Sequence, residues 1–169
     1  GQAYADALLE VLPEGVMQVV HGAGDQGKAL VEADVDLVVF TGSRAAGVHI
    51  LNQAGKDLKR VILELGGKDP MIVLDGANLD KAAVFAARNS FGNAGQVCVS
   101  TERIYVADAV HDAFVAKLIE AAKTTEIGPM VDARQKAHVV AQLDRADAQG
   151  AVVAWRGERN DGNYLAPVV

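Results

Sequence analysis

The chain has 169 residues, half of them hydrophobic, with a formal net charge of −6 and a sequence pI near 5.1. The apolar content suffices for a packed core and excludes global disorder, and the acidic balance without a basic stripe excludes a nucleic-acid-binding role. No apolar run approaches the roughly 20 residues that span a bilayer, so we expect no membrane partner. One cysteine rules out an internal disulfide and fits a reducing, cytoplasmic compartment.

The N-terminal part of the chain alternates predicted helices and strands. Apolar spacing predicts a helix over residues 2–12, which Pro13 and Gly15 end. The elements expected next are a strand at 16–20, a helix at 26–32, a strand at 37–40, a helix at 44–54 and a strand at 61–63. Strands that are apolar on both faces and alternate with helices are typical of an open parallel sheet covered by helices.

The pattern restarts after the double glycine at 66–67, which we take as a domain boundary between residues 1–66 and 67–169. Asn78 precedes the first helix expected beyond it, and Asp108 stands where it would cap the second. The expected strands are 71–74, 103–106, 151–155 and 165–169, and the expected helices are 79–90, 110–123 and 135–149. The whole chain is therefore predicted to be α/β.

Cys98 follows a glycine-rich loop at residues 92–96. A lone cysteine in an apolar context is usually a small buried core residue, but a glycine-rich approach favours a loop that brings backbone close to a ligand. A thiol can hold an acyl group as a thioester. Because a free thiol is mostly protonated at pH 7, a nucleophilic Cys98 would need a positive field, a base or a helix N-terminus nearby.

Two further patterns occur where predicted strands end. Glu64 ends an apolar strand, and the carboxyl ends of strands in open α/β sheets face the ligand crevice. Its carboxylate is either capped by a partner or placed in a site, where it could activate water. Residues 41–43 (Thr-Gly-Ser) join a strand to a helix, where free N–H groups attract phosphate. Such turns also carry Gly-Ser simply as turn and cap residues.

The four histidines give no sign of a catalytic or metal site. None stands at metal-ligand spacing with another or beside Cys98 in the sequence, so we treat them as structural or solvated. No zinc or EF-hand pattern is present, and we predict no metal. A cysteine hydrolase is disfavoured because no histidine motif accompanies Cys98.

Three segments together resemble the NAD(P)-dependent aldehyde dehydrogenase superfamily. Residues 40–43 resemble its cofactor turn, residues 63–68 (Leu-Glu-Leu-Gly-Gly-Lys) its general-base signature, and residues 91–98 its nucleophile loop. Later segments at 128–130 and 164–168 resemble two of its structural stretches. The likeness follows the family's order along nearly the whole chain, although the stretch between Ala121 and Gly128 is shorter than usual.

The resemblance implies a fold and a mechanism. Residues 1–66 would be the C-terminal part of a Rossmann-like cofactor-binding domain, and residues 67–169 the N-terminal part of the α/β catalytic domain. Cys98 would be the nucleophile that forms a thiohemiacetal and then a thioester, and its backbone N–H would form half of an oxyanion hole. Glu64 would be the base that activates water for deacylation.

The implied cofactor is NAD or NADP, and four residues would contact it: Gly42, Ser43, Gly47 and Leu65. The substrate would be a small aldehyde that the sequence does not specify. We expect the chain to be an internal fragment of a longer homo-oligomeric enzyme, with further cofactor-binding segments on both sides, and to be inactive alone.

Two alternatives stay open at this point. A CoA-acylating aldehyde dehydrogenase would use the same thiol, although Glu64 argues against it because that reaction needs no hydrolytic base. A non-catalytic structural homologue would keep Cys98 buried and inert.

Overall fold

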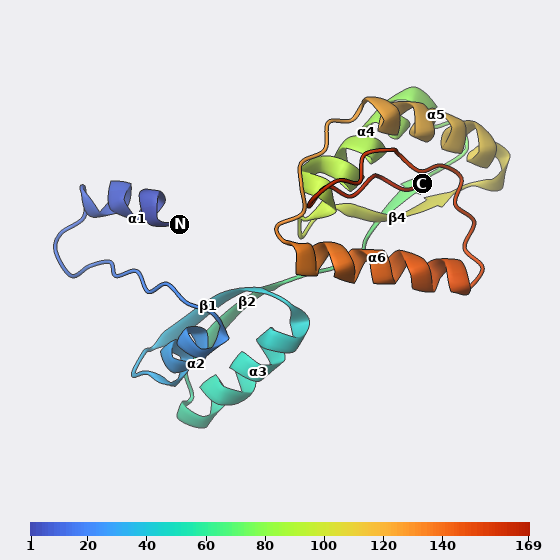
Figure 1. The fold of residues 1–169 in the computed structure, drawn as a ribbon. Helices are drawn as coiled ribbons and strands as arrows, with labels where there is room; N and C mark the ends of the chain where they lie inside the picture. The colour runs from blue at the N-terminus through green and yellow to red at the C-terminus, as the bar shows by residue number, and fades with distance from the viewer. The chain divides into compact units, whose positions relative to one another are not determined.

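The computed structural model describes all 169 residues and divides into two compact units, Gly1–Gly66 and Gly67–Val169 (Figure 1). Each unit contains one pair of parallel strands flanked by helices, which confirms the predicted α/β class. No helix combines the length and the apolar content needed to cross a membrane.

The first unit is built around strands β1 and β2. Its elements are α1 (Gln2–Leu9), α2 (Gly24–Glu32), β1 (Leu37–Gly42), α3 (Arg44–Ala54), a 3₁₀ turn η1 (Gly55–Asp57) and β2 (Arg60–Leu65). The two strands run parallel in register from the Leu37–Arg60 pair to the Gly42–Leu65 pair. Successive residues of both strands alternate between exposed and half-buried, so one face of the pair is packed and the other is open.

Two polar contacts fix the ends of this unit's elements. Helix α2 begins at Gly24, two residues before its predicted start, because the Gln26 side chain accepts a hydrogen bond from the Ala23 N–H at 2.9 Å. The Lys59 ammonium donates to the carbonyl oxygens of Val31 at 2.9 Å and Ala33 at 2.6 Å. That lysine therefore ties the start of β2 to the end of α2 and satisfies two helix-terminal acceptors.

The second unit has a well-defined apolar core. Its elements are β3 (Asp69–Val73), α4 (Leu79–Phe91), a 3₁₀ segment η2 (Gly92–Gly95), β4 (Thr101–Val106), a 3₁₀ turn η3 (Asp108–Val110), α5 (His111–Thr124) and α6 (Ala133–Ala148). Strands β3 and β4 are parallel, and α4 packs along α5. The buried core residues are Val73, Ala83, Ala86, Ala87, Phe114 and Leu118. Alanines on α4 let α5 approach closely enough for the Phe114 ring to be fully enclosed.

Four sequence-based predictions are wrong, namely three strands and one helix cap. Residues 16–20 and 151–155 form no strand, because no neighbouring strand supplies the ladder of hydrogen bonds that a strand requires. The second of these segments leads only to an isolated bridge between Arg156 and Val168, so the strand expected at 165–169 is also reduced to that contact. Asp108 does not cap α5, whose N-cap is Val110, since Asp108 lies in the preceding 3₁₀ turn.

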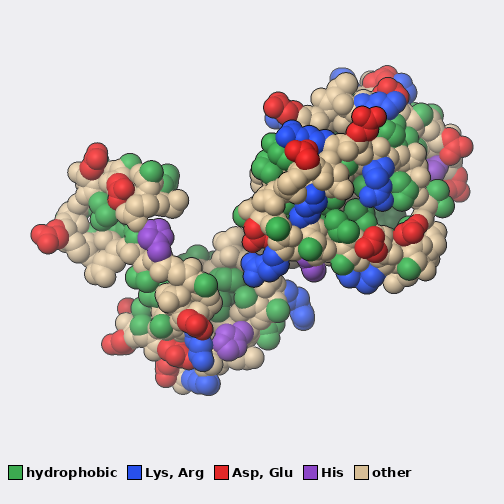
Figure 2. Space-filling model, in the orientation of Figure 1, with side chains coloured by type: hydrophobic (Ala, Val, Ile, Leu, Met, Phe, Trp, Pro, Cys, Tyr) green, Lys and Arg blue, Asp and Glu red, His purple; other side chains and the backbone are tan.

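Apolar side chains reach the surface of both units, as the green areas of Figure 2 show. In the first unit they include Val39 and Ile62 on the open face of the strand pair, which are 63% and 48% exposed. Blue and red side chains are interspersed on the visible face, without a single-sign patch.

Candidate functional site

The carboxyl ends of β1 and β2 bring Glu64 and the turn at residues 41–43 together. Thr41 lies beside Glu64 in the parallel register, and Gly42 lies beside Leu65. The side chains of Thr41 and Glu64 are exposed on the open face of the pair, whereas Leu65 is half-buried on the packed face. The Glu64 carboxylate has no hydrogen-bond or ion-pair partner among the side chains of the chain, so no partner caps it.

The N-terminus of α3 follows directly from Gly42. Ser43 is its N-cap, and its Oγ accepts a hydrogen bond from the Ala46 N–H at 3.2 Å. That bond leaves the Ser43 hydroxyl hydrogen free to donate, and helix geometry leaves the N–H groups of Arg44 and Ala45 without intrahelical acceptors. The N-terminus of α3 can therefore bind an anion.

Gly47 allows α3 to pack closely on β2. It is buried, and a Cβ at this position would lie 2.8 Å from Leu65 Cδ2. Any larger residue at 47 would push Leu65 away from the helix. The structure thus gives Gly47 and Leu65 a shared packing role directly behind the anion-binding end of α3.

Cys98 lies in the second unit, in a turn that leads into β4. The Ser100 N–H closes this turn on the Val97 carbonyl oxygen at 3.0 Å, and the buried Ser100 hydroxyl donates to the Gly95 carbonyl oxygen at 3.3 Å. The Cys98 side chain itself is exposed, unlike that of a buried core cysteine. The thiol therefore projects from a turn whose backbone is fixed on both sides.

The loop before Cys98 has an uncommon backbone. Asn93, Ala94 and Gly95 have φ values of 52°, 57° and 73°, all in the left-handed region that only glycine adopts freely. The Asn93 side-chain amide donates to the Gln96 carbonyl oxygen at 3.0 Å. The Gln96 side-chain amide bonds in turn to residues 129–131. In the sequence Gln96 is marked only as part of the segment 91–98, because Pro129 and Val131 stand more than 30 residues further along the chain.

The structure therefore gathers five of the six predicted site residues at one end of the β1–β2 pair: Gly42, Ser43, Gly47, Glu64 and Leu65. The sixth, Cys98, belongs to the second unit. No group of three or more His, Cys, Asp and Glu side chains could hold a metal ion.

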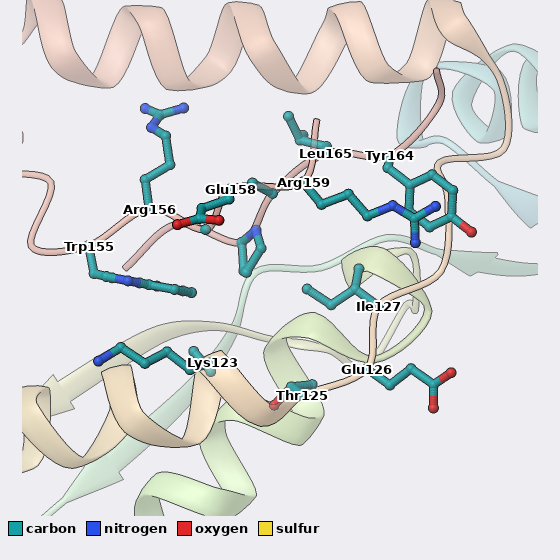
Figure 3. Close-up of a pocket in the computed structure, with 14 residues that line it drawn as sticks. Lys123, Thr125, Glu126, Ile127, Trp155, Arg156, Glu158, Arg159, Tyr164 and Leu165 are labelled. Carbon is teal, nitrogen blue, oxygen red and sulfur yellow. The ribbon is translucent and has the colours of Figure 1, made fainter. Parts of the chain in front are cut away.

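A separate cavity of about 500 Å³ lies in the second unit between the end of α5 and the segment around Trp155 and Tyr164 (Figure 3). Arg159 stacks on the Tyr164 ring, 3.3 Å from its centroid, and donates to the Asp161 carboxylate at 3.1 Å. This hydrogen bond raises the pKa of Arg159 and lowers the pKa of Asp161. None of the predicted site residues lines this cavity, and its basic and acidic side chains are mixed.

Comparison with known proteins assigns the chain's family. The aldehyde dehydrogenase family model matches residues 1–169. The glutarate-semialdehyde dehydrogenase of Pseudomonas putida is 39% identical over 170 residues, covering 94% of this chain and 35% of that protein.

Solved structures give the same result. The crystal structure of an NAD-dependent aldehyde dehydrogenase from Sinorhizobium meliloti superposes with a TM-score of 0.92 at 35% identity, covering 99% of this chain and 36% of the other. The structure of betaine aldehyde dehydrogenase from Staphylococcus aureus in complex with NAD⁺ has a TM-score of 0.90 at 31% identity and covers 99% and 37% of the two chains. The chain spans about a third of the length of the curated relatives it matches.

Proposed function

The chain belongs to the aldehyde dehydrogenase family, and we propose that its protein oxidises an aldehyde to a carboxylic acid with NAD(P)⁺ through a thioester on Cys98. The observation that carries this proposal is the exposed thiol of Cys98 on a turn fixed by hydrogen bonds from Ser100. A nucleophile has to be accessible and held in one place, and this turn meets both requirements.

The end of the β1–β2 pair supplies the proposed cofactor contacts. Pyrophosphate would bind at the N-terminus of α3, where Ser43 retains a hydroxyl hydrogen to donate and Gly42 adds no side chain. Gly47 and Leu65 would act from behind by holding α3 against β2. NAD⁺ is present in the structure of the Staphylococcus aureus relative, which supports a nicotinamide cofactor here.

The proposed chemistry begins with addition of the Cys98 thiolate to the aldehyde carbon, forming a C–S bond and a tetrahedral oxyanion. The Cys98 backbone N–H would donate a hydrogen bond to this oxyanion. NAD(P)⁺ held at the N-terminus of α3 would supply the hydride acceptor, so that the carbon would lose hydride and a thioester on Cys98 would remain. The aldehyde carbon is thereby oxidised by two electrons.

Glu64 would complete the cycle as a general base. Its unpartnered carboxylate could take a proton from water, whose oxygen attacks the thioester carbon and displaces the Cys98 thiolate. The products are the carboxylic acid and free enzyme. Hydrolysis at neutral pH needs such a base, because water alone attacks thioesters slowly.

Two substitutions in the full-length protein test these roles, with NADH formation measured by stopped flow. Cys98→Ala should abolish both the first turnover and steady-state oxidation. Glu64→Gln should keep a burst of one NADH per site and slow later turnover on the order of 10²-fold or more. Equal slowing of the burst and of the steady state in Glu64→Gln would contradict its role as the deacylation base.

Coenzyme A separates the main alternative. If the protein is a CoA-acylating enzyme, product formation will require coenzyme A and Glu64→Gln will have little effect. We expect oxidation without coenzyme A, because a hydrolytic base is present.

The isolated 169 residues should be nearly inactive. They span about a third of the relatives' length, and loss of a single oxyanion-hole donor typically costs on the order of 10²–10³ in rate. Robust NADH formation by the isolated chain would overturn this expectation.

We also propose that the whole protein is a cytoplasmic homo-oligomer. The proposed location rests on the single cysteine, which fits a reducing compartment.

A further inference from the structure

We propose that Gln96 is a positioning residue for Cys98: its side-chain amide clamps the loop before the thiol to the segment at residues 129–131. The inference rests on the proposed function, in which the Cys98 thiolate is the nucleophile. It concerns a residue that touches neither substrate nor cofactor in that mechanism and acts through the backbone that holds Cys98.

Both ends of the Gln96 amide are used. Its Oε1 accepts a hydrogen bond from the Val131 N–H at 2.9 Å, and its Nε2 donates to the Pro129 carbonyl oxygen at 3.4 Å. Nε2 also donates to the Asn93 carbonyl oxygen at 2.9 Å. The donor and acceptor pattern matches an amide and no other side chain of this length, since a carboxylate could not donate and a lysine could not accept.

The segment that Gln96 holds is itself anchored. Met130, between the two bonded residues, is 3% exposed, and its N–H donates to the Asn163 carbonyl oxygen at 2.8 Å. Its side chain lines an apolar cavity of about 150 Å³ together with Ala94 and residues of α6. The clamp therefore joins the loop to a segment that is anchored in the interior of the second unit through Met130.

The loop needs such a clamp because its backbone is held in sparsely populated conformations. Asn93 and Ala94 both have positive φ, and an alanine there gains no side-chain hydrogen bond in return. Without the Gln96 bonds these residues could relax toward negative φ. The turn from Val97 to Ser100 that carries the thiol would then shift with them.

A small shift of the thiol should have a large kinetic effect. Misplacing a reacting group by about 1 Å can cost up to about 10²-fold in rate, whereas binding contacts elsewhere are unaffected. A positioning role therefore predicts loss of kcat with little change in KM. A merely structural role predicts less folded protein with normal kcat per folded site.

The test uses Gln96→Met in the full-length protein, because methionine keeps the length of the side chain and removes its hydrogen bonds. We expect kcat for NAD(P)⁺-dependent aldehyde oxidation, normalised to folded sites, to fall about 10- to 100-fold, with both KM values within about twofold. Hydrogen exchange in peptides covering residues 95–102 should become at least about tenfold faster. Gln142→Met, at an exposed position of α6, is the matched control and should change neither quantity.

The outcomes separate the two proposals. A kcat within about twofold of wild type in Gln96→Met, or unchanged exchange at residues 95–102, overturns the positioning role while leaving the nucleophile intact. Aldehyde oxidation that survives in Cys98→Ala overturns the proposed function instead. A fall in kcat that Gln142→Met reproduces also counts against the clamp, because the side-chain hydrogen bond of Gln142 goes to His138 and not to the loop.

Discussion

The two units hold their candidate site residues in different ways. In the second unit, the turn that carries Cys98 leads into β4, whose Ile104 and Val106 pack against a core in which Val73 and Phe114 are each 1% exposed. In the first unit, Glu64 ends a two-stranded parallel pair with an open apolar face, where Ile62 is 48% exposed. The thiol is thus supported by packing within its own unit, whereas the carboxylate lies near the end of a strand pair with one open face.

This difference indicates how each unit responds to change. A two-stranded sheet is marginally stable by itself, and parallel strands are normally covered on both faces. The exposed Val39 and Ile62 mark a face that gives the first unit little stability. We therefore expect core substitutions to be costly in the second unit and mild on the open face of the first.

Removing the central aromatic ring of the second unit should have the largest effect. Phe114→Ala empties a fully buried site and should lower the free energy of unfolding by about 3–5 kcal/mol. Trp155 is the only tryptophan, so its fluorescence during urea unfolding of the 169-residue chain follows this unit alone. The matched Ile62→Ala, followed by far-UV circular dichroism, should cost less than about 1 kcal/mol. Equal losses of unfolding free energy in Phe114→Ala and Ile62→Ala would show that the two units do not differ in this way.

A second substitution tests the close packing of α3 on β2. Gly47→Ala places a Cβ 2.8 Å from Leu65 Cδ2, and we expect the overpacking, typically about 1–3 kcal/mol, to exceed the gain of about 1 kcal/mol from the better helix propensity of alanine. Gly55→Ala is the control, because its Cβ would meet nothing within 4 Å and its φ of −63° suits alanine. It should be neutral or slightly stabilising. Urea unfolding followed by circular dichroism measures the change in unfolding free energy for both variants.

A double variant makes this test specific. If Leu65 is the obstacle, Gly47→Ala should cost clearly less in a Leu65→Ala background, because the shortened side chain makes room. Additive losses would show that the contact between these two residues is not what makes glycine necessary at 47.

These packing relations show which features could be predicted from sequence. Helix α3 has the predicted bounds of 44–54, since a serine cap and a following glycine mark both ends locally. The segments at 16–20 and 151–155 look equally strand-like in composition but belong to no continuous strand ladder, which no local pattern reveals. Likewise, Gln96 lies within the segment 91–98 that carries the family resemblance, but its bond to Val131 joins positions 35 residues apart and depends on the fold.

The helix caps allow a comparison of equal local changes in the two units. Ser43 caps α3 and Asn78 caps α4, each by accepting a hydrogen bond from the N–H three residues later. Replacing either by alanine should cost about 1 kcal/mol, measured by urea unfolding. Only Ser43→Ala should also raise the KM for NAD(P)⁺ in the full-length protein, because only that cap lies at the proposed phosphate site. A similar rise for Asn78→Ala would contradict this assignment.

The smallest expected effect concerns Arg159 and Asp161, at the cavity of the second unit. The hydrogen bond from Arg159 lowers the pKa of Asp161, so the stability it contributes is present above the pKa of an unfolded aspartate and is lost as the pH falls through the folded value. The difference in unfolding free energy between wild type and Asp161→Asn should therefore shrink as the pH falls below about 4.

The matching rise in the pKa of Arg159 also stabilises the folded state. This contribution is present at neutral pH and is lost only when a strongly alkaline pH rises through the pKa of the folded state. Because both groups are exposed, added salt should weaken the Asp161 effect, since the distance over which charges interact, about 10 Å at 0.1 M salt, shortens as the salt concentration rises. Glu158→Gln, which removes a nearby carboxylate without a hydrogen-bonded partner, is the control. If it shows the same pH dependence as Asp161→Asn, the effect comes from net charge and not from the Arg159 contact.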